Sequence, residues 1–214
     1  MRLAFALLVV VAVAAYASPA KADGYYFTEA VGGAKISDQL SRYAGNGGFN
    51  ARIAIGRRSG SWAIEGWLSG LAAPGDDSRY GAPAEGTYDD HPGGATLMSY
   101  GVDVKYIKSI AKPLEVYLRG GISHGETQRV LEGYAGRGFG VGAGIAVKGK
   151  VSALGFLAWP LFFTKWGPRI TGALYLENGV DVFRLHRNGD IRDHRAVDAR
   201  VSRLLFGFAL GSDF

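Results

Sequence analysis

The chain has no cysteine among its 214 residues, so no disulfide stabilises its fold. After its first residues it also lacks any apolar run near the roughly 20 residues that a transmembrane helix needs. Its basic side chains are scattered among acidic ones, which argues against a nucleic-acid-binding surface. Four histidines lack metal-ligand spacing, so the sequence predicts no metal site and no other cofactor; they are His91, His124, His186 and His194.

The first 22 residues have the organisation of a secretory signal peptide. Arg2 precedes an apolar run over residues 3–15, and Ala20-Lys21-Ala22 forms an A-x-A-type cleavage site. We therefore expect residues 23–214 to form one exported domain. Removal of Arg2 and Lys21 lowers the formal net charge by two, from +5 to +3, so the mature domain is only weakly basic.

The mature chain alternates apolar and polar residues with a period of two. Phe49, Ile53 and Ile55, for example, alternate with Asn50 and Arg52, as in a strand with one apolar face. The pattern marks eight segments of about ten residues, the length of a tilted membrane-spanning strand. They lie near residues 25–36, 49–56, 62–69, 98–106, 114–123, 138–148, 170–182 and 196–214. An even number of such strands predicts a transmembrane β-barrel.

The connections between these segments alternate in length. Residues 37–47, 72–95, 124–136 and 185–195 are long and polar, whereas the links at 57–60 and 108–112 are short. Long loops outside and short turns in the periplasm are expected of an outer-membrane barrel. This asymmetry predicts that both chain ends lie on the periplasmic side.

Charged residues gather on one face of the predicted strands, and both signs are present. Such a set can pair inside a narrow lumen, whereas it would be a poor lining for the ligand cavity of a soluble lipocalin-like barrel, the rival fold. The predicted pairs include Arg52 with Glu65 across a hairpin. The predicted lumen network comprises Glu29, Arg52, Glu65, Asp103, Lys105, Glu115, Arg119, Glu177, Asp181 and Arg203.

The last strand places its large apolar residues on one face: Phe206, Phe208, Leu210 and the terminal Phe214. This ending resembles the signal that the barrel assembly machinery recognises. With the strand pattern, it makes the chain resemble the small eight-stranded outer-membrane barrels, the OmpA, OmpX and OmpW-like group. The resemblance implies an all-β, eight-stranded antiparallel up-and-down transmembrane β-barrel in the bacterial outer membrane. We further expect a monomer in contact with outer-membrane lipid and lipopolysaccharide. It implies no single activity, because the group includes adhesins, anchors, narrow passages and lipid-modifying enzymes.

The segment 151–166 breaks the pattern, because a periplasmic turn should be short and polar and this one is long and apolar. It can extend the two flanking strands, lie at the membrane interface, or fold back as a plug. The residues concerned are Phe156, Trp159, Phe162 and Trp166. A plug would fill the groove left by Gly138, Gly140, Gly142 and Gly144; alternatively these glycines make room for Tyr117 and Tyr175.

The predicted function is non-enzymatic: a surface, envelope-integrity or binding role through the extracellular loops. Arginines in or beside these loops are candidate contacts for lipopolysaccharide phosphates: Arg137, Arg187, Arg192 and Arg195. A narrow channel for small solutes is the alternative, and an outer-leaflet lipid-modifying enzyme is the third. Ser123 and His124 argue against the enzyme, because neighbours in a strand point to opposite faces and cannot act as nucleophile and base.

Overall fold

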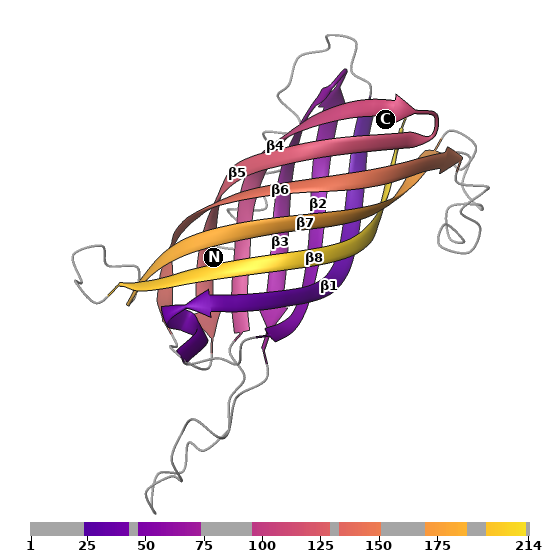
Figure 1. Ribbon diagram of the computed structural model, residues 1–214. Helices are drawn as coiled ribbons and strands as arrows, with labels where there is room; N and C mark the ends of the chain where they lie inside the picture. The colour runs from indigo at the N-terminus through magenta and orange to yellow at the C-terminus, as the bar shows by residue number, and fades with distance from the viewer. Residues whose placement is uncertain are drawn as a thin grey trace, which may run out of the picture.

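The computed structural model describes residues 24–42, 47–73, 96–128, 133–150, 170–187 and 196–212. Eight antiparallel strands follow one another around a closed barrel, which confirms the predicted fold class (Figure 1). A short 3-10 helix, η1 (Gln39–Arg42), follows the first strand. The strands are β1 (Gly24–Asp38), β2 (Gly47–Ser59), β3 (Trp62–Ala72), β4 (Thr96–Ala111), β5 (Leu114–Gln128), β6 (Tyr134–Lys150), β7 (Ile170–Arg187) and β8 (Val197–Ser212).

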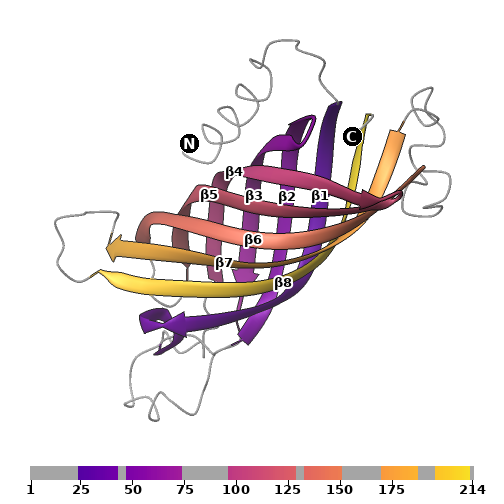
Figure 2. The same cartoon turned by 45° about the horizontal axis from the view of Figure 1, so that its top comes forward.

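The sheet closes where β8 pairs with β1, and the two strands lie side by side in Figure 2. Following the row of paired residues from Phe27 once around the barrel returns to β1 at Ser37, ten residues further on. This shear tilts the strands by about 43° from the barrel axis. The ends of the barrel differ. The β2–β3 and β4–β5 turns mark the turn end, and η1 marks the opposite, loop end.

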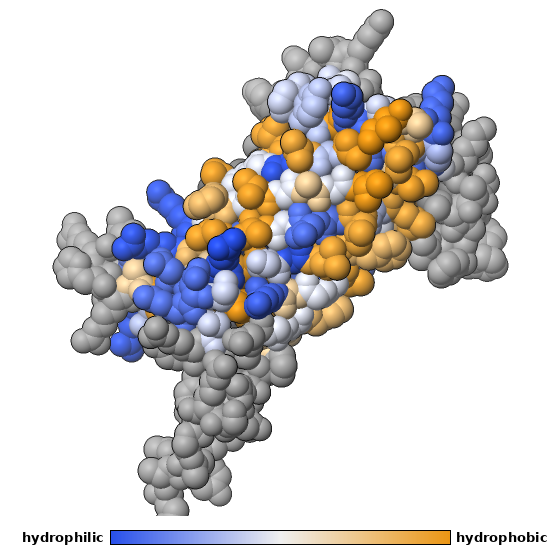
Figure 3. All heavy atoms as spheres, viewed as in Figure 1, coloured by the Kyte–Doolittle hydropathy of each residue, from blue (hydrophilic) through white to orange (hydrophobic). Residues whose placement is uncertain are grey.

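The outer wall of the barrel is largely apolar. Many large hydrophobic side chains are exposed on it, among them Ile122 at 72%, Leu118 at 60% and Phe139 at 59%. In Figure 3 they spread over the wall, and hydrophilic side chains gather toward the loop end, where β7 ends and β8 begins. Water-soluble proteins rarely expose so large an apolar surface. The wall therefore has the character of a surface in contact with lipid.

The face assignment predicted for β1 is wrong. Tyr26 and Ala30 are buried in the lumen, and Glu29 is exposed on the outer wall instead of joining the lumen network. The outer face of this strand mixes large apolar side chains with the charged Glu29 and Lys35, and its lumen face between Tyr26 and Ile36 is uncharged, so charge does not mark the lumen face here. The tyrosine decides the orientation, because its hydroxyl donates a hydrogen bond to Glu65 Oε2 at 3.2 Å inside the barrel. For the other seven strands the predicted faces are those of the structure.

Several strands continue into segments predicted to be loops. The connection predicted over 124–136 belongs largely to β5 and β6, which end and begin at Gln128 and Tyr134. These polar residues lack the alternation that predicts a strand, because near the barrel rim neither face of a strand needs to be apolar. Among the described residues, no helix is long and apolar enough to cross a membrane. The predicted signal peptide and the segment 151–166 lie outside the described residues.

Candidate functional site: a filled lumen and a basic outer rim

The middle of the lumen holds a network of buried ion pairs centred on Arg52 of β2. Its Nη2 lies 2.9 Å from Glu65 Oε1 and 2.7 Å from Asp103 Oδ2. Its Nη1 lies 3.4 Å from Glu177 Oε1. Arg119 of β5 joins the same carboxylates, with Nε 2.6 Å from Glu177 Oε1 and Nη1 3.1 Å from Asp103 Oδ2. The predicted pair of Arg52 with Glu65 is therefore present, together with partners from strands further around the barrel.

Two more cations complete this network. Lys105 Nζ lies 2.6 Å from Glu65 Oε2, and Arg203 Nη2 lies 3.0 Å from Asp181 Oδ2. The network thus joins four cations to four carboxylates, with side chains at most 8% exposed. A formal charge of zero matters here, because an unpaired charge in such a site costs several kcal/mol.

Aromatic side chains surround the network. The Tyr117 hydroxyl donates a hydrogen bond to Glu177 Oε2 at 2.8 Å. The Trp67 ring contacts two guanidinium groups, with its centre 4.7 Å from that of Arg52 and 5.8 Å from that of Arg203. These bulky groups occupy space between the ion pairs and hold the cations by cation–π attraction.

A smaller cluster lies nearer the turn end. Glu115, predicted for the lumen network, pairs there with Arg58, whose Nη1 and Nη2 lie 3.0 Å and 3.1 Å from its two carboxylate oxygens. Lys148 Nζ adds a third contact at 3.0 Å. Arg58 is not among the predicted lumen residues, because the sequence predicts a turn over 57–60, whereas β2 continues to Ser59.

The lumen glycines of β6 face large side chains from neighbouring strands. A side chain at Gly144 would collide with the ring of Tyr117, and one at Gly140 with the carboxylate of Asp181. A side chain at Gly138 would collide with the ring of Phe183. The groove left by these glycines is therefore occupied from within the barrel.

An apolar cluster fills the loop end of the lumen, and the sequence reading missed it. Phe183 and Val201 come from β7 and β8, Ile36 comes from β1, and Leu40 comes from η1. All four are at most 1% exposed. The helix is held over the barrel mouth partly by the Gln39 side chain, which accepts a hydrogen bond from the backbone N–H of β8 at 3.1 Å. We call this group, with the other residues packed in it, the apolar cap.

Three arginines form a basic rim on the outer wall at the loop end. Arg137 of β6 and Arg184 of β7 are paired in register, and Arg200 of β8 lies one diagonal further on. All three side chains are exposed, and none forms an ion pair with another described residue. Arg184 is also paired in register with the exposed Asp198 of β8, but the two side chains form no ion pair. Like charges opposite each other on neighbouring strands are unfavourable, so an anion between Arg137 and Arg184 would be favourable. Of these three arginines, the sequence predicts only Arg137 as a lipopolysaccharide contact.

The other predicted lipopolysaccharide contacts divide into two groups. Arg187 is exposed at the end of β7, close to the basic rim. Arg192 and Arg195 lie outside the described residues. In the assembly signal, Phe206 lies on the outer wall and is 56% exposed, and Phe208 and Leu210 share its face; Phe214 lies outside the described residues.

Ser123 and His124 point to opposite sides of the barrel wall. Ser123 is buried in the lumen, and the His124 ring packs on the outside against Tyr100, with the ring centres 5.3 Å apart. These two residues therefore do not form a nucleophile–base pair. Among the described residues, no group of histidines and carboxylates has the arrangement of a metal site.

A closed up-and-down sheet with an apolar outer wall and a filled, polar lumen defines a transmembrane type of β-barrel. No protein-family model and no curated protein matches the sequence. Among solved structures, neisserial surface protein A is similar, with a TM-score of 0.55 and 17% identity over 89% of this chain and 97% of that one. This similarity shows that the chain has the fold of the small eight-stranded outer-membrane barrels, as its sequence resemblance predicts.

Two further structures were found at lower TM-scores. Ail, the attachment invasion locus protein of Yersinia pestis, was solved in complex with the heparin analogue sucrose octasulfate; its TM-score is 0.45 and its identity 10%, over 88% of this chain and 98% of that one. The N-terminal β-barrel domain of Pseudomonas aeruginosa OprF has a TM-score of 0.39 and 14% identity, over 88% and 99% of the two chains.

Proposed function

We propose that this protein is a non-enzymatic envelope protein of the bacterial outer membrane, which binds lipopolysaccharide phosphates through its basic rim. The observation that carries the proposal is the group of exposed arginines beside a lumen that is already filled. The signal peptide over residues 1–22, the recognition of the last strand by the barrel assembly machinery and the monomeric state belong to the same proposal.

The dimensions of the outer wall support a membrane position. Aromatic residues form a girdle at the turn end, where the Trp62 and Tyr106 ring centres lie 5.0 Å apart and Tyr25 is exposed nearby. On β1, the ten residue steps from Tyr25 to Lys35 climb about 24 Å along the barrel axis, at a rise of about 3.3 Å per residue and the tilt given above. An outer-membrane barrel has an apolar band of about 25 Å between its interfaces. Lys35 and the basic rim then lie at the extracellular interface, and the short turns lie in the periplasm.

The chemistry of the rim favours a phosphate ligand. Guanidinium groups bind phosphate oxygens through paired, charge-assisted hydrogen bonds. Arg137, Arg184 and Arg200 are at the depth of the outer-leaflet headgroups, where lipopolysaccharide carries its phosphates. An anion shared among them would also relieve the repulsion between the paired arginines.

The test is binding of purified lipopolysaccharide to refolded protein, measured for the wild type and for the triple variant Arg137→Gln, Arg184→Gln, Arg200→Gln. We expect the variant to bind at least about tenfold more weakly, because about 1 kcal/mol is lost for each basic residue at a membrane surface. Lys112→Gln, in the β4–β5 turn at the opposite end of the barrel, is the control and should bind as the wild type does. Unchanged binding by the triple variant, together with unchanged polymyxin sensitivity of cells that carry it, would exclude the rim as the site.

The channel and the enzyme have less support. The ion-pair network and the apolar cap both occupy the lumen, and an eight-stranded barrel has room inside for little beyond its own side chains. The one Ser–His neighbour pair of the described strands is split across the barrel wall. Lipid hydrolysis by the purified protein would reverse the order of these proposals.

A further inference from the structure

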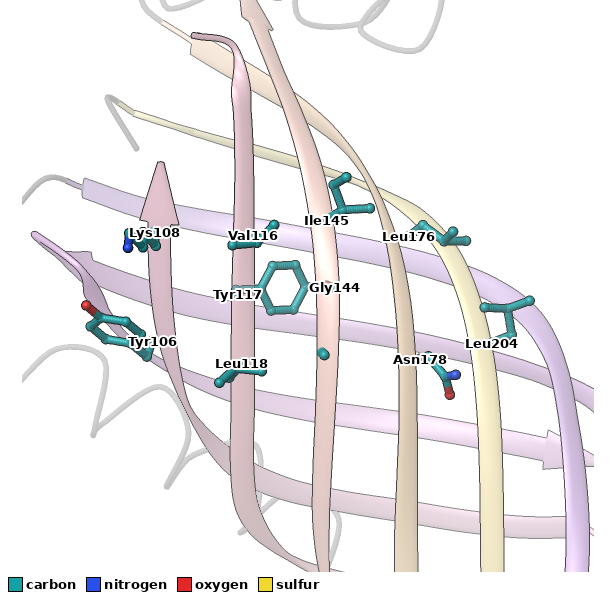
Figure 4. A pocket seen from close by; sticks show the side chains of 11 residues that line it. Tyr106, Lys108, Val116, Tyr117, Leu118, Gly144, Ile145, Leu176, Asn178 and Leu204 are labelled. Carbon is teal, nitrogen blue, oxygen red and sulfur yellow. The ribbon is translucent and has the colours of Figure 1, made fainter. Parts of the chain in front are cut away.

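A shallow groove crosses the outer wall over β4, β5, β6 and β7 and reaches β8, with room for about 490 Å³. This volume is within the range of about 300–1,000 Å³ that ligand sites occupy. Apolar side chains make up most of its lining. Figure 4 shows Lys108 and Tyr106 on one side, Asn178 and Leu204 on the other, and Val116, Leu118, Ile145 and Leu176 among the residues between.

The hollow has a cause in the sequence. Ala143 of β6 is paired in register with Leu118 of β5 on one side and Asn178 of β7 on the other. Its methyl group is the smallest side chain in this row, and the larger Val141 and Ile145 lie above and below it on the same strand. The wall is therefore lower at Ala143 than around it.

The groove has a direction relative to the membrane. It begins at Lys108, next to the aromatic girdle at the turn end, and it ends at Asn178. Counting strands and residues along the register gives a rise of about 14 Å between these two residues along the barrel axis. This is about half of a hydrocarbon core of about 30 Å, so the groove spans one leaflet.

We infer that the groove holds one phospholipid of the periplasmic leaflet, with an acyl chain along Val116, Ala143 and Leu176 and its phosphate at Lys108. The inference rests on the proposed outer-membrane position, which makes this leaflet the one of phospholipid headgroups. The charges are complementary. Lys108 and Lys112 in the adjoining turn are both exposed, and neither forms an ion pair with another described residue.

A second copy of the chain fits the groove less well. In a two-fold interface the same patch meets itself, so two hollows would face each other and leave a void where packing is needed. The same symmetry would bring the Lys108 side chains of the two copies near each other. An acyl chain fills the hollow, and a phosphate neutralises the lysine.

The test is native mass spectrometry of refolded, delipidated protein in detergent, titrated with phosphatidylglycerol. We expect the wild type to retain one lipid. Ala143→Phe places a ring in the groove and should weaken retention of the lipid at least about tenfold. Lys108→Gln should weaken it about fivefold, in keeping with the loss of one basic residue beside an anionic headgroup. Asn178→Leu, which makes the lining more apolar, should retain the lipid at least as well as the wild type.

Matched controls lie on the same wall but outside the groove: Val104→Phe on β4 adds the same ring as Ala143→Phe, and Lys35→Gln removes a charge at the other interface. Both should retain lipid as the wild type does. Equal retention by the wild type and Ala143→Phe would overturn the inference, as would a dimer mass in place of a lipid-bound monomer.

A second measurement does not depend on variants. Phosphatidylglycerol with a nitroxide near the end of its acyl chain should broaden the methyl resonance of Ala143 more than those of Ile53, which lies at a similar depth on the opposite part of the wall. Equal broadening would also overturn the inference. The rim triple variant should keep the phospholipid, so failure of the lipopolysaccharide test and failure of the groove test can be told apart.

Discussion

The two ends of the lumen are filled in opposite ways. From the middle toward the turn end, the filling is made of charged side chains that hold one another through ion pairs. At the loop end it is an apolar cap with side chains from five strands and η1, such as Phe183 and Leu40. The charged filling depends on specific partners, because each charge must be neutralised where it lies. The apolar filling depends on volume and shape, because dispersion and burial have no direction.

The two fillings have different roles in this narrow barrel. The ion-pair network fixes the strands relative to one another, since its members come from six strands: β2, β3, β4, β5, β7 and β8. The apolar cap excludes water from the loop end of the lumen, beyond the ion-pair network. Together the two regions fill most of the described lumen, so the surfaces that remain for function are the rim and the outer wall.

The largest effect should come from breaking the charged region. Arg52→Met removes the cation that contacts three carboxylates, and we expect a loss of about 3–5 kcal/mol in the free energy of unfolding, because uncompensated charge stays buried. Urea unfolding of the refolded protein in lipid vesicles measures this loss. Adding Asp103→Asn restores formal neutrality and should recover about half of it. A loss below about 1 kcal/mol for the single variant would show that the network does not hold the barrel together.

Breaking the apolar cap should cost somewhat less. Phe183→Ala removes a fully buried ring from a packed cluster and should lower the free energy of unfolding by about 3 kcal/mol. Phe183→Leu, which keeps most of the volume, should cost less than about 1.5 kcal/mol. Comparison of Phe183→Leu with Phe183→Ala sharpens the contrast between the two regions. At Arg52 an apolar side chain of similar size, as in Arg52→Met, should not preserve stability. If Phe183→Leu and Phe183→Ala cost the same, the cap is not held by packing.

A smaller effect of opposite sign is expected at Glu29. This carboxylate lies on the outer wall between Phe27 and Val31, where it has none of the cations that surround the lumen carboxylates. Charged groups facing lipid are destabilising, and carboxylates less so than arginine or lysine. Glu29→Leu should therefore raise the free energy of unfolding in vesicles by about 1 kcal/mol, with Glu115→Leu as a contrasting variant that lowers it. A destabilised Glu29→Leu variant would indicate that this side chain has a partner in the membrane.

The sequence predicted the charged region far better than the apolar one, for a physical reason. Within the lipid-facing band a strand must alternate, so Arg52, Asp103 and Glu177 are recognisable as lumen residues. Beyond the lipid-facing band, near the loop end, a strand need not alternate. The residues of the apolar cap are therefore flanked in sequence by polar residues, as loop residues are. In β1 the rule that charge marks the lumen face fails, because its charged residues Glu29 and Lys35 lie on the outer wall and its lumen face is uncharged up to Ile36. The basic rim could not be predicted from the sequence, because only the register between β6 and β7 shows that Arg137 lies beside Arg184.

The smallest expected effect is the absence of any current. The two fillings follow one another along the axis, so each closes the lumen alone, and in planar bilayers we expect no discrete openings from the wild type, from Arg52→Met or from Phe183→Ala. A variant that combines both substitutions loses a guanidinium from one region and a ring from the other, and it is the one we expect to conduct. Openings in the wild type would mean that the fillings move together and would restore the channel proposal. Suppose that just one of the two single-substitution variants shows openings. The region which that substitution disrupts would then be the one that closes the barrel, because the other region is intact in that variant and still lets ions pass.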